Sequence, residues 1–438
     1  MNWEETNKCA IDAMLEGRLE DANENAQKAV ELAKELNDDA LLEKSLTNLG
    51  IIQEELGCYE DSYATLNLAL DTMNRLHEEN EDTAELLINI AEGLVDRDTL
   101  EQSDAHLEEA TNLLRKAMKI YEDKLGPAHP LFADTMSRLA VVFSMRGAME
   151  PAQMMYAESL DTLKECMDKN EPEIAARMLT LSEMYMQTGT VDKAEPLLKD
   201  ALKIFKKTDG EESVEVSTIE NELGEIYMQQ GKFDDAKPLF EHALKIREKE
   251  LEDNHPALAQ SYNNLAVLFD NLGKPKDSIP LHEKALKVRK AAFGERHPAI
   301  TQSLENLAAA YQAERKIDEA EELMRESLSI WTEYAGEDHP ATAQSMFDLG
   351  TLLFIRGKVR EGEKVIVKAK DIMEGHLGQD NPAMAMVYKA LATVYETLHN
   401  KSEEEKYTKL FDNLKEAAGL AEPENPEDSK KETRKYKK

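Results

Sequence analysis

The hydrophobic residues of this chain recur at helical spacing, in segments separated by glycine and proline. Between Pro256 and Leu272 the apolar residues follow one another at steps of three and four, which places them on one face of an amphipathic helix. Gly273 then supplies the backbone freedom that a helix end requires, and a second helical pattern runs from near Asp277 to Gly294. No segment alternates apolar and polar residues as a strand would. The pattern predicts an all-α chain built from helix hairpins.

The hairpin recurs with a period of 42 residues. Six of the 14 prolines are separated by 42 residues or a multiple of it, namely Pro130, Pro172, Pro256, Pro298, Pro340 and Pro382. Glycines at the hairpin turns follow the same period, namely Gly147, Gly189, Gly231, Gly273 and Gly357. A fixed period of this length is typical of stacked repeats, in which each repeat buries its apolar face against its neighbours. We therefore predict an α-solenoid of about ten helix-turn-helix repeats.

The period divides the chain into three sections. Residues 1–125 hold three irregular hairpins, with an insertion at 93–104 that delays the second helix of the third hairpin by seven residues. Residues 126–418 hold seven repeats in strict register. Residues 419–438 contain few apolar residues and have a basic end, so we expect them to be disordered. The insertion is our candidate for a hinge between the irregular and the regular sections.

The repeated residues resemble the tetratricopeptide repeat. Leu223, Gly224 and Tyr227, followed by Ala236 and Phe240, match the pattern of that repeat, and the 42-residue period resembles the version found in kinesin light chains. The resemblance implies a right-handed superhelix whose concave groove is lined by the first helix of each hairpin. The first predicted hairpin begins at about residue 2, so we expect a free-standing array without the heptad segment of kinesin light chains.

Charge and composition exclude several classes of partner. The net charge is −35, and such a field repels nucleic acid and anionic membrane surfaces but attracts basic partners. No apolar stretch is long enough for membrane insertion. The three cysteines have no metal-ligand spacing, and their small number is typical of a reducing compartment. We therefore predict a cytoplasmic protein that binds neither nucleic acid nor metal.

Histidine is the candidate catalytic side chain, and its positions argue against catalysis. Four histidines stand immediately before prolines of the 42-residue frame, namely His129, His255, His297 and His339. Proline suits the first position of a helix, and the residue before it is driven out of helical geometry, so we interpret these histidines as helix N-caps. A catalytic residue would not recur at intervals of 42 residues along an extended array, and no catalytic or nucleotide-binding motif occurs. We predict a non-enzymatic protein without catalytic residues or cofactors.

The candidate binding site lies on the face that the resemblance places in the groove. Positions 13, 9, 6 and 2 before each turn carry ten acidic and three basic residues, but in repeats seven to nine six of these positions carry amides and only Asp348 is acidic. Primary amides donate to and accept from the backbone of an extended peptide. In kinesin light chains, the asparagines that match Asn264 and Asn306 contact the cargo backbone. The predicted peptide-binding residues are Gln260, Asn263, Asn264, Gln302, Asn306, Gln344, Asp348, Glu222, Glu225, Asn48 and Asn89.

These observations favour a scaffold or adaptor that binds an extended peptide segment, either basic or neutral. Two alternatives stay open at this point. The amides are also compatible with a solvated surface that has no partner. The chain is also compatible with a self-assembling structural protein, a homo-oligomer in which the groove or the basic end from Lys430 to Lys438 docks on a second copy.

Overall fold

The computed structural model describes residues 2–76, 80–101, 104–168 and 171–417. These residues form 20 α-helices and one 3₁₀ turn, with no strand in the described part of the chain, so the predicted all-α solenoid is confirmed. Consecutive helices pack as antiparallel hairpins, and each hairpin also contacts the next one within its compact unit. The predicted disorder of 419–438 lies outside the described residues.

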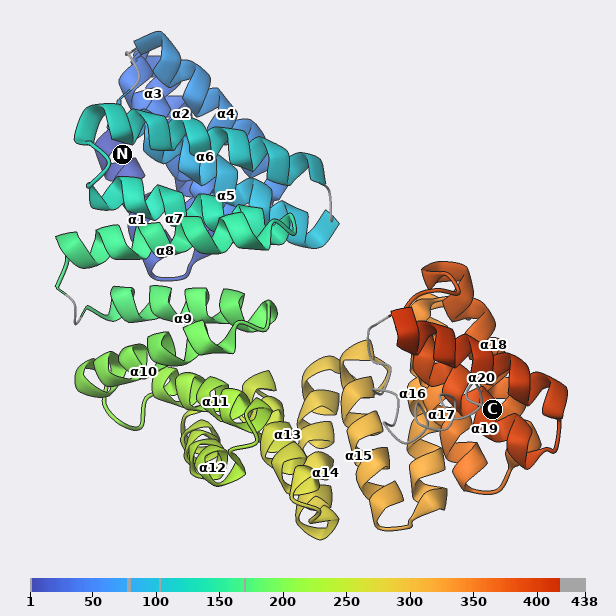
Figure 1. The fold of residues 1–438 in the computed structure, drawn as a ribbon. Coiled ribbons are helices and arrows are strands. Elements are labelled where there is room, and N and C mark those ends of the chain that lie inside the picture. Colours follow the sequence, from blue (N-terminus) through green and yellow to red (C-terminus); the bar gives the residue numbers. More distant parts are fainter. Residues whose placement is uncertain (1, 77–79, 102–103, 169–170, 418–438) are drawn as a thin grey trace, which may run out of the picture. The chain divides into compact units, whose positions relative to one another are not determined.

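The first compact unit, Met1–Glu211, contains five hairpins, drawn in blue to green in Figure 1. Its helices are α1 (Trp3–Leu15), α2 (Leu19–Leu36), α3 (Asp39–Glu55), α4 (Tyr59–Leu76), α5 (Glu81–Glu101), α6 (Asp104–Leu125), α7 (Pro130–Met145), α8 (Met149–Cys166), α9 (Pro172–Gln187) and α10 (Val191–Thr208).

The second compact unit, Glu212–Lys438, contains the other five hairpins. Its helices are α11 (Val214–Gln229), α12 (Phe233–Glu250), α13 (Pro256–Asn271), α14 (Pro275–Phe293), η1 (Pro298–Ile300), α15 (Thr301–Ala313), α16 (Ile317–Ala335), α17 (Pro340–Ile355), α18 (Val359–Leu377), α19 (Met384–Thr397) and α20 (Lys401–Ala417). The odd-numbered helices are the first helices of the hairpins, and in unit 2 α11 contacts α13, which contacts α15.

The histidines before proline are helix N-caps, as predicted. Nδ1 of His297 accepts a hydrogen bond from the backbone N–H of Ala299 at 3.1 Å. The same bond caps α7, α13 and α17 at His129, His255 and His339. This bond satisfies a backbone donor that has no partner within the helix, so these histidines serve to begin helices.

The hairpin turns require a left-handed backbone, and the repeat frame identifies where. Gly231 and Gly273 have φ angles of 72° and 67°. Two frame positions that lack glycine, Arg315 and His399, have φ angles of 61° and 57°. Together with Asn37 they are the positive-φ residues other than glycine in the described part of the chain. The 42-residue period therefore predicts the backbone conformation even where the residue type does not.

Close approach of the two helices explains a second glycine position. A Cβ on Gly224 of α11 would lie 2.6 Å from the ring of Phe240 in α12, and that ring is fully buried. Gly50 faces Leu66 in the same way, and Gly350 faces Ile366. These hairpins pack a large side chain against a bare backbone.

The insertion predicted at 93–104 is taken up as helix length. α5 continues through Glu101, and α6 begins at Asp104. These helices have 21 and 22 residues, so each is longer than the 18 residues of α4 or α8. The hinge that we expected here stays a prediction, and the division into compact units falls after Glu211. Among the described residues, no helix is both long enough and apolar enough to cross a membrane.

Candidate functional site

The predicted binding residues lie on the first helices of their hairpins. We call the face of α11, α13, α15 and α17 that carries them the first-helix face of unit 2. The residues on it are Glu222, Glu225, Gln260, Asn263, Asn264, Gln302, Asn306, Gln344 and Asp348. Asn48 and Asn89 lie on α3 and α5 in unit 1. The predicted set therefore falls into two groups, and unit 2 holds the larger one.

Asparagine side chains link successive repeats across this face. Nδ2 of Asn264 donates to Oδ1 of Asn221 at 3.2 Å, and Nδ2 of Asn306 donates to Oδ1 of Asn263 at 2.8 Å. In each pair, the residue nine before its turn contacts the residue ten before the turn of the preceding repeat. We call Asn221, Asn263, Asn264 and Asn306 the amide ladder. Its hydrogen bonds run between repeats, so it fixes how one repeat is placed on the next.

Unit 1 contains the same contact, at Asn48. Nδ2 of Asn48 donates to Oδ1 of Asn7 at 3.0 Å, and Asn89 lies half-buried on α5. In unit 2, Asn263 is only 8% exposed. Asn263 accepts a hydrogen bond from Asn306 and offers a partner little surface, and its contact with a peptide stays a prediction. The accepting asparagine of each pair stands ten residues before its turn. The groove positions considered from the sequence were 13, 9, 6 and 2 before the turn, so this contact between repeats was not predicted.

Glu225 collects three amide donors at one carboxylate oxygen. Its Oε1 accepts from Nδ2 of Asn264 at 2.6 Å, from Nδ2 of Asn221 at 2.9 Å and from Nε2 of Gln260 at 3.4 Å. Burial raises the pKa of Glu225, and the amide hydrogen bonds oppose that rise because they favour the charged form. The structure thus brings two predicted residues, Asn264 and Gln260, together with Asn221 around the partly desolvated carboxylate of a third predicted residue, Glu225.

A buried arginine lies beneath this cluster. Arg247 of α12 is 3% exposed, and it donates to the hydroxyls of Ser217 and Ser261 and to the carbonyl of Ala257, at 2.9–3.1 Å. Burial lowers its pKa, and the negative charge of Glu225 opposes this. Because its partners are neutral groups on α11 and α13, Arg247 ties the two first helices together.

One repeat beyond Asn263 and Asn306, the corresponding positions hold two carboxyl groups, Glu305 and Asp348, which lie near each other. Burial raises the pKa of Asp348 in α17, whereas hydrogen bonds from Gln344 at 3.1 and 3.2 Å oppose the rise. Burial also raises the pKa of Glu305 in α15, and the charge of Asp348 adds to this rise. Glu305 stands ten residues before its turn, in the frame of Asn263. It is a first-helix residue that the sequence analysis missed.

Ion pairs neutralise part of the predicted acidic face in unit 1. Arg138 pairs with Glu92 and donates to Asp134 at 2.8 Å. Arg177 also pairs with Asp134, and with Glu173 at 3.0 Å. Arg177 stands 12 residues before its turn, beside the positions that we scored as the groove. A count of the charges at positions 13, 9, 6 and 2 before the turn omits Arg177, so it overstates the negative charge of the first helices in unit 1.

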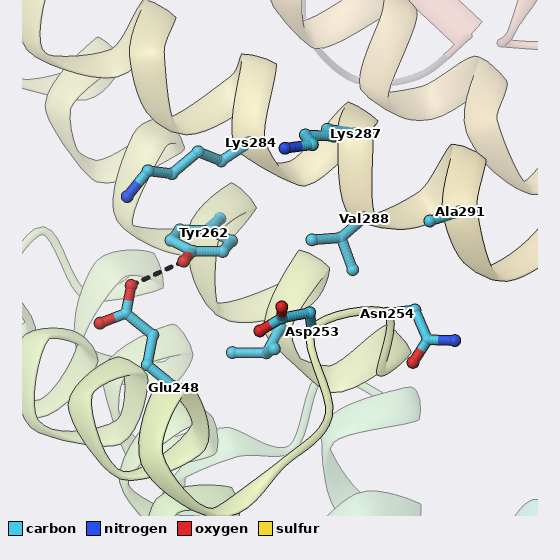
Figure 2. Close-up of a pocket in the computed structure, with 9 residues that line it drawn as sticks. Glu248, Asp253, Asn254, Tyr262, Lys284, Lys287, Val288 and Ala291 are labelled. Atoms are coloured by element: carbon cyan, nitrogen blue, oxygen red, sulfur yellow. Dashed lines mark hydrogen bonds between the residues drawn. The ribbon is translucent and has the colours of Figure 1, made fainter.

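A hollow of about 510 Å³ opens elsewhere on α13. Figure 2 shows Tyr262 of α13 beside Lys284 of α14, with Oη of Tyr262 donating to Glu248 at 2.6 Å. The Lys284 ammonium lies 4.9 Å from the centre of the Tyr262 ring. Tyr262 is two residues from Asn264, roughly 200° around the helix. The hollow therefore opens on the side of α13 away from Asn264.

The sequence of this repeat explains why the hollow is there. In the next repeat, Nε of Arg296 donates to Glu333 at 3.0 Å and bridges the loop to α16. At the positions 42 residues earlier stand Asn254 and Ala291, both of which line the hollow. Their short side chains cannot form that bridge. In the described part of the chain, no group of three His, Cys, Asp or Glu side chains is placed to hold a metal ion.

Comparison with protein families identifies the repeats. One model of the tetratricopeptide repeat matches residues 215–291 and 298–361, and a second model of the same repeat matches residues 99–131. The first model covers the helices that carry Glu225, Asn264 and Asn306. No curated protein matches the chain by sequence.

Solved structures share the fold over most of the chain. The apo form of RapI is 15% identical with a TM-score of 0.62, and the match covers 87% of this chain and 99% of RapI. The apo form of the quorum sensor NprR from B. thuringiensis is 14% identical with a TM-score of 0.59, covering 83% of this chain and 99% of that one. BtubC from P. vanneervenii is 27% identical over 54% of this chain and 92% of its own, with a TM-score of 0.45. At their low identities, RapI and NprR establish the fold alone.

Proposed function

The chain is a tetratricopeptide-repeat protein, and we propose from this premise that it works as a scaffold that binds a protein partner without catalysing a reaction. The binding segment is an extended peptide, basic or neutral, and it lies on the first-helix face of unit 2. Stacked repeats expose long continuous surfaces of this kind, and such surfaces are used for binding.

The observation that carries the proposal is the spacing of exposed amides. Gln260, Gln302 and Gln344 stand one period apart, and all three are exposed on successive first helices. An amide side chain has both a donor and an acceptor, as does each residue of a peptide backbone. A row of such groups suits an extended segment whose side chains vary, because the contacts are made to its backbone.

The charge of this face supports a basic or neutral segment. Within the described residues, Glu225 and Asp348 accept hydrogen bonds from amides and form no ion pair. An acidic segment would place its carboxylates beside these two and would be repelled. The net charge of −35 also speeds the approach of a basic segment at low salt.

A displayed library of random ten-residue peptides, selected on the immobilised protein, tests the proposal. We expect the wild-type chain to select peptides, and we expect the double variant Asn264→Ala/Asn306→Ala to bind them at least about tenfold more weakly. Each lost hydrogen bond contributes about 0.5–1.5 kcal/mol, and two such losses multiply. Fluorescence anisotropy with a labelled selected peptide measures the affinity, and circular dichroism checks that the variant keeps its helices.

The hollow on the other side of α13 provides the matched control. The double variant Lys284→Ala/Lys287→Ala changes two residues that line it and leaves the first-helix face intact. This control is expected to bind the selected peptide as the wild type does. Loss of binding in the lysine variant together with full binding in the asparagine variant would place the site in the hollow and contradict the proposal.

A further inference from the structure

The hydrogen bonds around Glu225 fix which way the neighbouring amides point. An ionised carboxylate only accepts, so Asn221, Asn264 and Gln260 must all turn their NH₂ groups toward Glu225. Their carbonyl oxygens then point away from it. The amides on this part of the first-helix face are therefore oriented by the protein before any partner arrives.

The donors of this cluster are largely used within the protein. Both N–H groups of Asn264 are engaged, one with Glu225 and the other with Oδ1 of Asn221. All three amides bond to Oε1 of Glu225, so none of these bonds uses Oε2. The groups left for a partner are then chiefly acceptors, namely Oε2 of Glu225, Oδ1 of Asn264 and Oε1 of Gln260. This differs from our sequence-based view, in which Asn264 could both donate and accept.

The charge of the cluster is negative although Arg247 lies beneath it. Arg247 directs its N–H groups to hydroxyl and carbonyl oxygens of α11 and α13 and forms no hydrogen bond with Glu225. Glu225 is partly desolvated, and a charge in such a place gains more from an opposite charge than an exposed one does. A cationic side chain of a partner would therefore contact hydrogen-bond acceptors that the protein has already oriented.

We infer that Oε2 of Glu225, with the carbonyl oxygens of Asn264 and Gln260, receives one arginine or lysine side chain of the bound peptide. Guanidinium and ammonium groups carry several N–H donors and no acceptor, which matches this surface. This inference rests on the proposed function and sharpens it, because it assigns a basic residue to one position of the segment. The backbone contacts would then be made farther along, at Asn306, Gln302 and Gln344.

The cluster selects an organic cation over a metal ion. It offers one carboxylate and two amide oxygens, and no group of three His, Cys, Asp or Glu side chains suited to a metal ion occurs among the described residues. Asp348 is less suited to the same role, because both of its oxygens accept from Gln344 in its own helix. Of these two carboxylates, Glu225 is thus the specificity-determining one.

The test compares the wild type with Glu225→Gln, using the displayed ten-residue library and then the selected peptides. Glutamine keeps the length of the side chain and its Oε1 acceptor, so the cluster can persist without the charge. The wild type is expected to enrich arginine or lysine at one position, and Glu225→Gln is expected to lose that preference. In the anisotropy assay, replacing an arginine at this position by citrulline, or a lysine by norleucine, should weaken wild-type binding about tenfold or more and variant binding less than about threefold.

Asp348→Asn is the matched control, since it removes one negative charge from the same face and leaves Glu225 in place. It is expected to keep the preference for a basic residue. Selected peptides with no enriched basic position would overturn the inference while leaving the proposed function intact. Equal loss in Asp348→Asn and Glu225→Gln would also overturn it, since general charge would then explain the preference. Selection of no peptide at all by the wild type would contradict the proposed function itself.

Discussion

Glu321 of α16 is a buried carboxylate surrounded by three cations. Arg325 of the same helix and Lys358 each donate to it at 2.9 Å, and Arg356 also pairs with it. Burial would raise the pKa of Glu321, but the hydrogen bonds from Lys358, Arg356 and Arg325 outweigh burial and lower the pKa to about 2. The cluster joins the second helix of one hairpin to the turn of the next.

This depressed pKa predicts a loss of stability in acid. The ordinary value is 4.5, so the folded state gains stability from Glu321 above that pH and loses it as the pH falls toward about 2. At pH 7, Glu321→Gln is expected to lower the free energy of unfolding by about 1–3 kcal/mol, because the three cations are partly exposed. Urea unfolding at pH 7 and pH 3 measures this, and an equal difference at both pH values would refute the assignment.

For single residues, the sequence predicts the roles that depend only on neighbouring residues along the chain. His297 caps a helix because the proline that follows it fixes the backbone there. The roles of Asn263 and Arg177 depend instead on a neighbouring repeat, where the reach of a side chain matters as well as its place on the helix. A rule that scores four positions on one face cannot register contacts of this kind.

The hairpin is built around the contact of Gly224 with Phe240. The two lie 16 residues apart, which is the separation of Gly50 from Leu66 and of Gly350 from Ile366. Helix ends follow from the sequence, because proline and the turn position restrict the backbone locally. The length of α5 and α6 does not follow in the same way, since the inserted residues suit a loop as well as a helix by composition alone.

Gly224→Ala is expected to destabilise this hairpin by about 1–3 kcal/mol, because the new Cβ would collide with the buried ring. Phe240→Ala removes the ring and with it the collision, so adding Gly224→Ala to Phe240→Ala should cost little further stability. Thermal unfolding of the four proteins, followed by circular dichroism, measures the cycle. Additive losses would mean that the ring does not limit the approach of the two helices.

The chain divides into two compact units, whose helices Figure 1 shows. Each unit has buried hydrophobic residues of its own. The boundary follows Glu211, although Gly210 lies in the same 42-residue frame as Gly294 and Gly336. A periodic sequence gives no sign of such a boundary, because the period continues through it. The packing of one repeat on the next depends on side chains that the period does not specify.

Light scattering of the chain with and without residues 421–438 addresses self-assembly. The proposed function assigns the first-helix face to a separate peptide, so we expect the two proteins to have the same number of subunits per particle. A particle that loses subunits when the tail is removed would support the alternative, in which the basic end docks on a second copy. Measuring the pair at low and high salt would show whether charge holds that contact.

The amide ladder also bears on how such an array changes its length over evolutionary time. A chain that lost residues 274–315, one full period, would place Asp348 opposite Asn263, where Asn306 now stands. The amide of Asn263 could then donate to that carboxylate, so the new junction would still pair a donor with an acceptor. An amide side chain can either donate or accept a hydrogen bond. Amides at the contacts between repeats therefore allow a whole repeat to be deleted or duplicated while a donor still meets an acceptor at the new contact.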